Sequence, residues 1–473
     1  MESLWSRTTQ LPEFEESPED LRVQNLVIGG GIAGILIAYL LQEKGQEVVV
    51  LEANEIASGQ TKNTTAKITS QHGLIYHDMI QNTGKERALG YAATNETAIK
   101  KYEEIITKEG IACHFEKLPS FLYSVEHAGV QKLKQEAEAA KDLGLKAKYV
   151  EGENITELPF PITGAVRFEE QAQFHPLEFI QAIASKLTIY ENTRVLEVDD
   201  YIITTDKGMV VADNVIFATH YPFPIVPGYY FLRQHQSRSY VLALEGEDVP
   251  KQLKGMYYGI DKNGISLRCA EGKLLFGGSA HRTGRRIRAK RQASSIEQMM
   301  SGNGRITPGF CGLRKRAKEL YPKAKEFAYW AAQDCMPHDH IPFIGRFSRQ
   351  KDHWYIATGF QKWGMSTAMV AAMIISDQIV GKENPYAWVF TPQRLLLKAG
   401  IKDFGIDVYE SVLGLTKGIF TKKERKCPHM GCALTWNEDE GTWDCPCHGS
   451  RFEEKGALID NPAQTDLPIE NKQ

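Results

Sequence analysis

The 473-residue sequence lacks several features that would place it in a specialised class of protein. No uninterrupted apolar run reaches the about 18 residues that cross a bilayer, and the nearest candidate, residues 368–375, is short. Residues 1–20 show none of the basic, apolar or twin-arginine features of an export signal. The formal net charge of −3 indicates no nucleic-acid, membrane or acidic partner. We therefore expect a cytoplasmic protein without an integral membrane segment.

Length and composition predict a soluble globular protein of two or three domains. The chain is too long for one ordinary hydrophobic core. Its 42% hydrophobic and 24% charged residues are typical of a folded soluble protein.

The eight cysteines are unevenly placed. Four are scattered, whereas Cys427, Cys432, Cys445 and Cys447 lie in one short segment near the C-terminus. In a reducing compartment such a cluster indicates a metal site before it indicates a disulfide framework.

A dinucleotide-binding unit is predicted near the N-terminus. An apolar run at 23–28 suits a buried strand, and it leads into Gly29, Gly31 and Gly34 at the start of a helical pattern. These glycines permit a tight turn, close approach of a pyrophosphate and close packing of helix on strand. A second strand ends at Glu52, which is placed to accept hydrogen bonds from a ribose. The alternative is a glycine turn that binds no nucleotide.

The chain contains one such fingerprint, whereas flavoproteins that also bind NAD(P)H usually carry two. We therefore expect FAD as the single dinucleotide, with electrons supplied by an organic substrate.

Four segments resemble the D-amino-acid oxidase-like family of FAD-dependent oxidoreductases. They are the stretch from Val27 to Glu52, the β-rich stretch that begins Arg194-Val195 and ends Ala218-Thr219, the Ile341-Pro342-Phe343-Ile344-Gly345 turn, and the stretch from Tyr355 to Ser366. In the family the last segment opens a helix whose N-terminus faces the flavin pyrimidine, where its amides stabilise negative charge on the reduced ring.

The motif and the resemblance together predict the FAD contacts. A loop rich in small hydroxyl residues, 57–67, is expected to follow the pyrophosphate, with Lys67 near the flavin and His72 a free histidine rather than a covalent attachment point. The predicted contacts are Gly29, Gly31, Ile32, Ala33, Gly34, Glu52, Ser58, Gly59, Thr61, Val195, Ala218, Thr219, Gly345, Gly359, Gly364 and Met365.

The middle of the chain is expected to hold a substrate domain. Arg233, His235, Arg238 and Tyr240 cluster on a strand-like run, and one arginine there could clamp a substrate carboxylate. A strand facing solvent would have the same pattern. Residues 283–325 are basic and poorly patterned for the family, and no catalytic residue is assigned.

Near the C-terminus, two Cys–His pairs have the spacing of a Rieske [2Fe–2S] site. The predicted ligands are Cys427, His429, Cys445 and His448, because two thiolates hold one iron of such a cluster and two imidazoles hold the other. A structural zinc site is the alternative, although it usually pairs cysteine with cysteine and histidine with histidine.

Resemblance to the Rieske proteins of respiratory and photosynthetic complexes implies further roles. Cys432 and Cys447 match the pair that forms a disulfide between the ligand loops, and Ser450 matches a hydroxyl donor to a bridging sulfide. The tyrosine donor of the family is replaced by Phe452. We therefore expect a potential in the middle of the Rieske range, and a value near the upper limit of about +300 mV would contradict this.

These expectations combine into one domain plan. The fold class is an α/β Rossmann-like FAD-binding domain of the glutathione-reductase type with a mixed-sheet substrate domain, followed by a small all-β Rieske domain. The expected boundaries are an N-terminal extension at 1–21, the oxidoreductase at 22–394, a linker at 395–412 and the Rieske domain at 413–473. FAD-binding parts fall at about 22–80, 190–225 and 335–385, and substrate parts at about 81–189 and 226–334. Because few residues precede Cys427, part of the Rieske base is expected to be missing or supplied by the flavin domain.

The arrangement resembles bacterial FAD-dependent oxidoreductases with a C-terminal Rieske domain. It implies that an amine or amino-acid-like substrate gives a hydride to FAD, and that electrons pass through the cluster and its exposed histidine edges to an unidentified acceptor. Three alternatives remain open: electron flow from an external donor to the flavin, a redox sensor or carrier without a small substrate, and an oxidase that uses O₂.

Overall fold

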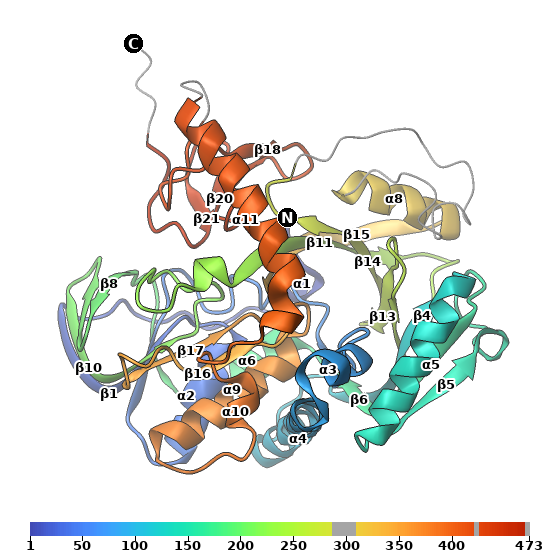
Figure 1. The fold of residues 1–473 in the computed structure, drawn as a ribbon, viewed down its shortest axis with the longest axis horizontal. Coiled ribbons are helices and arrows are strands. Elements are labelled where there is room, and N and C mark those ends of the chain that lie inside the picture. The colour runs from blue at the N-terminus through green and yellow to red at the C-terminus, as the bar shows by residue number, and fades with distance from the viewer. Residues whose placement is uncertain (286–308, 421–424, 469–473) are drawn as a thin grey trace.

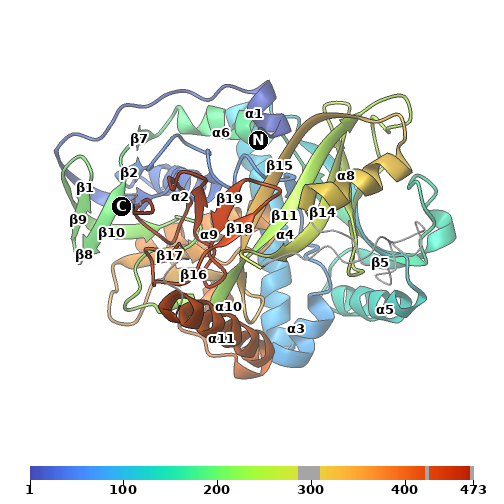
Figure 2. The ribbon, with the colours of Figure 1, turned by 90° about the horizontal axis from the view of Figure 1, so that it is seen from above.

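The fold was analysed in a computed structural model, which describes residues 1–285, 309–420 and 425–468 (Figure 1). Two large β-sheets lie side by side, and a small third sheet sits above their junction, as Figures 1 and 2 show from two directions. Most of the basic segment that we found atypical lies outside the described residues. No described helix combines the length and the apolar character needed to cross a membrane.

The first sheet contains the predicted dinucleotide-binding unit. Its central strands are parallel and buried, as the continuous apolar runs indicate. The order is β16 (Phe343–Arg346), β17 (Trp354–Thr358), β10 (Met209–Phe217), β1 (Asp20–Ile28), β2 (Val48–Leu51) and β7 (Thr188–Tyr190), with β8 (Val195–Asp199) and β9 (Ile202–Thr205) extending from β10. Helices α2 (Ile32–Glu43) and α9 (Gly364–Ile379) pack against each other and are almost entirely buried.

The second sheet is mixed and forms the expected substrate domain. The order is β15 (Lys325–Pro337), β11 (Gln234–Glu245), β14 (Lys273–Arg282), β13 (Ser266–Ala270), β12 (Met256–Gly259), β4 (Glu116–Ser124), β6 (Gly164–Gln173) and β3 (Lys67–Ile68), with β5 (Ala147–Glu151) beside β6. The helices outside the two sheets are α3 (Tyr76–Thr83), α4 (Lys85–Glu109), α5 (His127–Asp142), α6 (Pro176–Ala184), α8 (Gly309–Leu320) and α10 (Ala387–Phe390), with 3₁₀ turns η1 (Gly152–Asn154) and η2 (Tyr230–Leu232).

The N-terminal extension is folded against both sheets. Helix α1 (Leu4–Thr8) buries Leu4 and Trp5 completely, and Glu2 forms a β-bridge with Tyr329. The indole nitrogen of Trp5 donates to the backbone oxygen of Thr64 at 2.8 Å. The extension therefore supports the loop that was predicted to follow the pyrophosphate.

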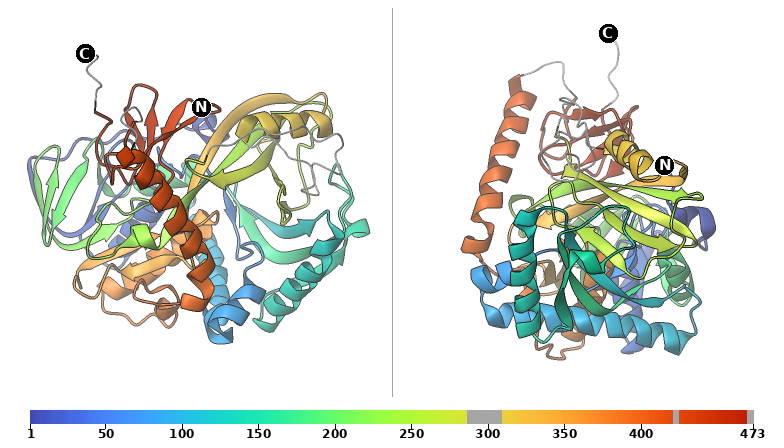
Figure 3. Two further views of the ribbon diagram at one scale, coloured as in Figure 1. Left: turned by 45° about the horizontal axis from the view of Figure 1, so that its top comes forward. Right: turned by 90° about the vertical axis from the view of Figure 1, so that its right-hand side faces the viewer.

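The C-terminal part is a four-stranded antiparallel sheet behind one long helix. The strands are β18 (Thr435–Asn437), β19 (Thr442–Asp444), β20 (Arg451–Glu453) and β21 (Leu458–Asp460). Where we expected a linker, the structure has helix α11 (Leu397–Phe420), which runs along the outer edge of the molecule (Figure 3). This helix precedes the first ligand loop, where we expected part of the domain's base to be missing or supplied by the flavin domain.

Candidate functional site

The turn between β1 and α2 is shaped by glycine, as the motif predicts. Gly29 has a φ of +111°, and a Cβ atom there would lie 2.6 Å from the backbone oxygen of Ala218. A Cβ atom on Gly34 would lie 1.9 Å from the oxygen of Gly29, so α2 packs this closely on β1 only without a side chain. At the start of α2, the amide of Ile32 donates to the hydroxyl of Thr61 at 2.9 Å. The turn thus has the close backbone packing of a phosphate-binding loop.

Glu52 stands at the carboxyl end of β2 and braces the same turn. Its carboxylate accepts hydrogen bonds from the backbone amide of Gly30 at 2.7 Å and from that of Asn54 at 2.9 Å. Burial raises the pKa of Glu52, while these two hydrogen bonds lower it. Each oxygen retains a lone pair with which it could bind a ribose hydroxyl.

A cavity of about 1250 Å³ extends from this turn to the substrate sheet. Fourteen of the sixteen predicted FAD contacts line it: Gly29, Gly31, Ile32, Ala33, Glu52, Ser58, Gly59, Thr61, Val195, Ala218, Thr219, Gly359, Gly364 and Met365. They come from five separate parts of the sequence. The structure therefore brings these segments together around one space of cofactor size.

Two predicted contacts lie elsewhere. Gly34 sits behind the turn, where it has the packing role described above. Gly345 lies in the edge strand β16, and the nearest atoms to a Cβ there belong to the side chain of Gln378. The Pro-x-Ile-Gly turn thus shapes the sheet edge without bordering the cavity.

The cavity is also lined by ionisable side chains, among them Lys67, which we expected near the flavin, and Asp334, for which we had no expectation. Lys67, 7% exposed, donates from Nζ to the backbone oxygen of Tyr257 at 3.0 Å and to the hydroxyl of Ser266 at 2.6 Å. Burial, with a smaller effect of nearby Arg268, lowers the pKa of Lys67 to about 7. Burial raises the pKa of Asp334 to about 6. Both groups can therefore change protonation near neutral pH. The alternating pattern of a strand does not by itself predict that these two side chains are buried.

The arginine cluster on β11 does not form the substrate clamp that we considered. The guanidinium of Arg238 is buried and binds the carboxylate of Glu440 through two hydrogen bonds. Arg233 stacks on the ring of Phe343 at 4.2 Å, and His235 contacts Asp407 of α11. Arg238 and His235 thus contact the C-terminal part of the chain, Arg233 contacts the first sheet, and the guanidinium of Arg238 is already paired with a carboxylate.

His72 is fully engaged with protein groups. Its Nδ1 lies 2.6 Å from the hydroxyl of Tyr91, and its Nε2 lies 2.7 Å from the backbone oxygen of Thr69. The ring stacks on Trp363. His72 therefore supports Trp363, which lines the cavity, and does not line the cavity itself.

The four predicted cluster ligands meet at the tip of the small sheet. The thiols of Cys427 and Cys445 are hydrogen-bonded to each other, and the rings of His429 and His448 lie 5.0 Å apart and nearly perpendicular. The Nδ1 atoms of both histidines are buried without a hydrogen-bond partner in the described chain. Burial lowers the pKa of His429 to about 4 and that of His448 to about 3, so both rings are neutral at pH 7. Two thiols and two unpartnered imidazole nitrogens are the donor set of a Rieske cluster.

The surroundings of these ligands agree with the expected subtype. Cys432 and Cys447 form a disulfide between the two loops. The hydroxyl of Ser450 accepts from the amide of Ala463 at 3.0 Å and also bonds to the thiol of Cys427. Phe452 is fully buried and offers no hydroxyl group.

Helix α11 closes the base of this site through glycine. A Cβ atom on Gly414 would lie 2.7 Å from the sulfur of Cys447, and one on Gly418 would lie 2.2 Å from the oxygen of Gly431. The oxygen of Gly414 also accepts from the amide of Ala433 at 3.1 Å. The shortened domain is thus completed by a close-fitting helix.

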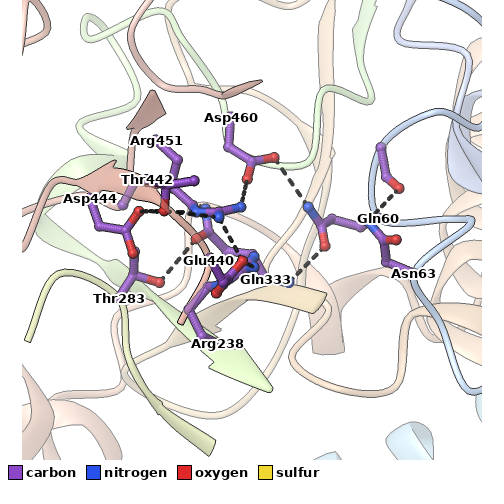
Figure 4. Close-up of polar contacts among 12 residues, drawn as sticks. Gln60, Asn63, Arg238, Thr283, Gln333, Glu440, Thr442, Asp444, Arg451 and Asp460 are labelled. Carbon is purple, nitrogen blue, oxygen red and sulfur yellow. Dashed lines mark hydrogen bonds and ion pairs between the residues drawn. The ribbon is translucent and has the colours of Figure 1, made fainter. Parts of the chain in front are cut away.

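A buried ionic network joins the small sheet to the flavin domain (Figure 4). Glu440, whose side chain is fully buried, lies between the guanidinium groups of Arg238 and Arg451. Burial alone would raise the pKa of Glu440, but the two arginines lower it to about 2. Arg451 also binds Asp444 and Asp460, and Asp460 accepts from the side chain of Gln60 at 3.2 Å.

His448, one of the predicted ligands, faces inward at this interface. It is 4% exposed, its ring makes an edge contact with Phe231, and its backbone oxygen accepts from Gln236 at 2.7 Å. This differs from the expected exposed histidine edges, because β11 and η2 cover the ring. His429 remains partly accessible.

Comparison with known proteins agrees with this geometry. The FAD-dependent oxidoreductase family model matches residues 25–378, and the Rieske [2Fe-2S] domain model matches residues 404–470. The chain belongs to the FAD-dependent oxidoreductase family. It is a flavoprotein whose cofactors are FAD and a Rieske [2Fe-2S] cluster, as predicted.

Individual relatives share either the whole plan or the flavin fold. The flavoprotein is 33% identical to the Rieske 2Fe-2S iron–sulfur protein YhfW of Bacillus subtilis, over 98% of this chain and 96% of that protein. L-amino acid deaminase from Proteus vulgaris is 17% identical, with a TM-score of 0.63 over 82% of this chain and 100% of that one. Glycine oxidase from Geobacillus kaustophilus is 17% identical, with a TM-score of 0.61 over 79% and 99%. These two structures establish the shared fold.

Proposed function

We propose that this flavoprotein oxidises an amine or amino-acid-like substrate and passes the electrons from FAD to its own Rieske cluster. One observation carries this proposal: the C-terminal part forms a wall of the same cavity that the FAD-binding motifs line. Glu440, Thr442, Arg451, Asp460 and Asn461 all border that cavity. FAD supplies two-electron hydride chemistry, and the cluster supplies one-electron transfer.

The residues that would hold the cofactors follow from the geometry. We assign FAD to the fourteen predicted residues that line the cavity and the cluster to Cys427, His429, Cys445 and His448. The domain boundaries would be as predicted, except that α11 spans the predicted linker and would belong to the Rieske domain. Trp363 and Tyr258 line the cavity near Lys67 and would exclude water from the reacting region.

The substrate class is supported by the ionisable groups of the cavity and by fold relatives named for amino acids. The relatives are an L-amino acid deaminase and a glycine oxidase. Nζ of Lys67 and the carboxyl group of Asp334 border the cavity and can hold or release a proton near pH 7. A substrate amine would lose a proton when its adjacent C–H bond is oxidised, so such groups suit this class.

Anaerobic rapid mixing with amines and amino acids tests the proposal. We expect the flavin absorbance to bleach first, followed by the electron paramagnetic resonance signal of a reduced Rieske cluster. Bleaching without cluster reduction, with hydrogen peroxide formed in air, would favour the oxidase alternative. Flavin reduction only from an external donor through the cluster would favour the opposite direction of electron flow.

A further inference from the structure

Two histidines and one aspartate meet where helix α11 packs on the flavin domain. Nδ1 of His235, Nε2 of His338 and a carboxylate oxygen of Asp407 all lie within 4.8 Å of one another. In the part of the chain that the structure describes, no other group of three potential metal ligands is this compact outside the cluster loops. The FAD cavity does not account for these residues, because none of the three lines it.

The two imidazole nitrogens converge on the same oxygen of Asp407. Nδ1 of His235 lies 3.2 Å from Oδ2, and Nε2 of His338 contacts that oxygen as well. In a tetrahedral site with bonds of about 2.0–2.1 Å, neighbouring ligand atoms lie about 3.3 Å apart. The spacing of His235 and Asp407 therefore already matches that of two ligands of one ion.

Arg282 binds the other oxygen of this carboxylate and leaves Oδ2 to the histidines. The same guanidinium donates to the backbone oxygen of Cys447 at 3.3 Å. Ligating carboxylates are themselves hydrogen-bonded, and such contacts orient them toward the ion. Arg282 can therefore orient Asp407 as a ligand, and it links the site to one of the cluster loops.

Each of the three side chains is carried by a different ordered element. His235 is in β11, His338 follows β15 directly, and Asp407 is near the middle of α11. A Cβ atom on Gly400 would lie 3.3 Å from the side chain of His338, and the ring of Phe404 makes an edge contact with the imidazole. The helix thus approaches His338 closely, and ligands held in this way need little rearrangement to bind an ion.

We propose that His235, His338 and Asp407 bind one divalent transition-metal ion, and that Zn²⁺ fits this donor set. Zn²⁺ accepts imidazole and carboxylate ligands and can hold water at its fourth position. The side chain of His235 is 22% exposed, so solvent can reach the site. The two nitrogen donors and the charge of Arg282 disfavour Ca²⁺ and Mg²⁺, which are held by oxygen ligands.

The ion would stabilise the attachment of α11 to the flavin domain. The helix meets the protein at Gly400, Gly414 and Gly418, and glycine has no side chain with which to hold a surface. An ion shared by Asp407 and two histidines would connect the helix to both β11 and the end of β15, and its binding free energy would add to the stability of the fold. The proposal is independent of the substrate and of the direction of electron flow.

Calorimetric titration of the chelator-treated holoprotein with Zn²⁺ tests this inference. We expect uptake of one Zn²⁺ per chain and no comparable binding of Mg²⁺, with flavin and iron contents unchanged. His235→Gln and, separately, His338→Gln should each weaken Zn²⁺ binding at least about tenfold, because even the outer-shell partners of a ligand contribute that much. His114→Gln, which changes an exposed histidine elsewhere on the surface, is the control and should bind Zn²⁺ as the wild type does.

Anomalous diffraction at the zinc edge, which distinguishes zinc from the iron of the cluster, then locates the ion in the wild type. We expect a peak between the three side chains. No uptake of Zn²⁺, equal affinity of both histidine variants and the wild type, or a peak only elsewhere would overturn the proposal. So would loss of iron during the titration, because zinc would then occupy the cluster ligands. Flavin and cluster absorbance of each variant reports folding.

Discussion

The two cofactor regions of this flavoprotein are assembled in opposite ways. The four proposed cluster ligands come from two neighbouring loops, Cys427–His429 and Cys445–His448. The FAD cavity is lined by residues from the N-terminal turn, four later segments and the Rieske domain itself. A site made of four ligands depends on each of them, whereas a broad cavity distributes its contacts over many groups. The consequences of single substitutions should differ accordingly.

The largest effect is expected at a cluster ligand. Cys427→Ser removes one of two thiolates, and we expect complete loss of the [2Fe–2S] cluster with retention of FAD. Iron content and flavin absorbance of the purified variant measure both outcomes. Cys311, which is exposed and unpaired, provides the control: Cys311→Ser should retain both cofactors. Concurrent loss of FAD from Cys427→Ser would show that the two regions do not assemble separately.

A substitution in the glycine turn between β1 and α2 should have the opposite effect, with loss of FAD and retention of the cluster. Gly34→Val would place side-chain atoms into the backbone oxygen of Gly29, which lies only 1.9 Å from a Cβ atom there. We expect loss of FAD binding, because the turn and α2 must move apart. Gly45→Val, at the end of the same helix, meets no atom within 4 Å but carries a positive φ, so it controls for strain alone. Normal FAD content in Gly34→Val would contradict the assigned packing role.

The sequence allowed this contrast to be predicted only in part. The glycine spacing at 29, 31 and 34 and the Cys–His spacing near the C-terminus each encode a local geometry, so both cofactors were predicted correctly. The Arg238–Glu440 pair joins strand β11 to the turn between β18 and β19, 202 positions later in the sequence, and no local pattern signals it. The alternating side chains of β11 were compatible with a substrate clamp. The sequence of the strand alone does not show that the C-terminal domain covers these side chains. The helix that covers the predicted linker at 395–412 was not recognised, because a helix that packs through glycine lacks the usual apolar inner stripe.

The junction between the regions should respond to loss of its central charge. Glu440→Gln leaves the guanidinium groups of Arg238 and Arg451 buried without their shared carboxylate. Removing one partner of a buried ionic group costs about 3–5 kcal/mol, and we expect a matching loss in thermal stability and slower reduction of the cluster by the flavin. Glu438→Gln, an exposed change on the same hairpin, is the control. An unchanged rate in Glu440→Gln would show that docking does not limit electron transfer.

The smallest effect concerns Lys67, which belongs to the cavity alone. Burial lowers the pKa of Lys67 from 10.5, the value for a free lysine, to about 7 in the folded chain, so between these pH values the unfolded chain binds more protons. The cost of burying a charged lysine is therefore complete below pH 7 and is relieved as the pH rises from 7 toward 10.5. The unfolding temperature of the wild type should rise with pH over this interval relative to that of Lys67→Met, measured by release of flavin fluorescence. Lys262→Met, which removes another lysine that borders the same cavity, is the control and should follow the wild type. If Lys67→Met and the wild type show parallel profiles, then bound FAD keeps Lys67 protonated, and the FAD cavity, unlike the cluster site, is shaped electrostatically by its cofactor.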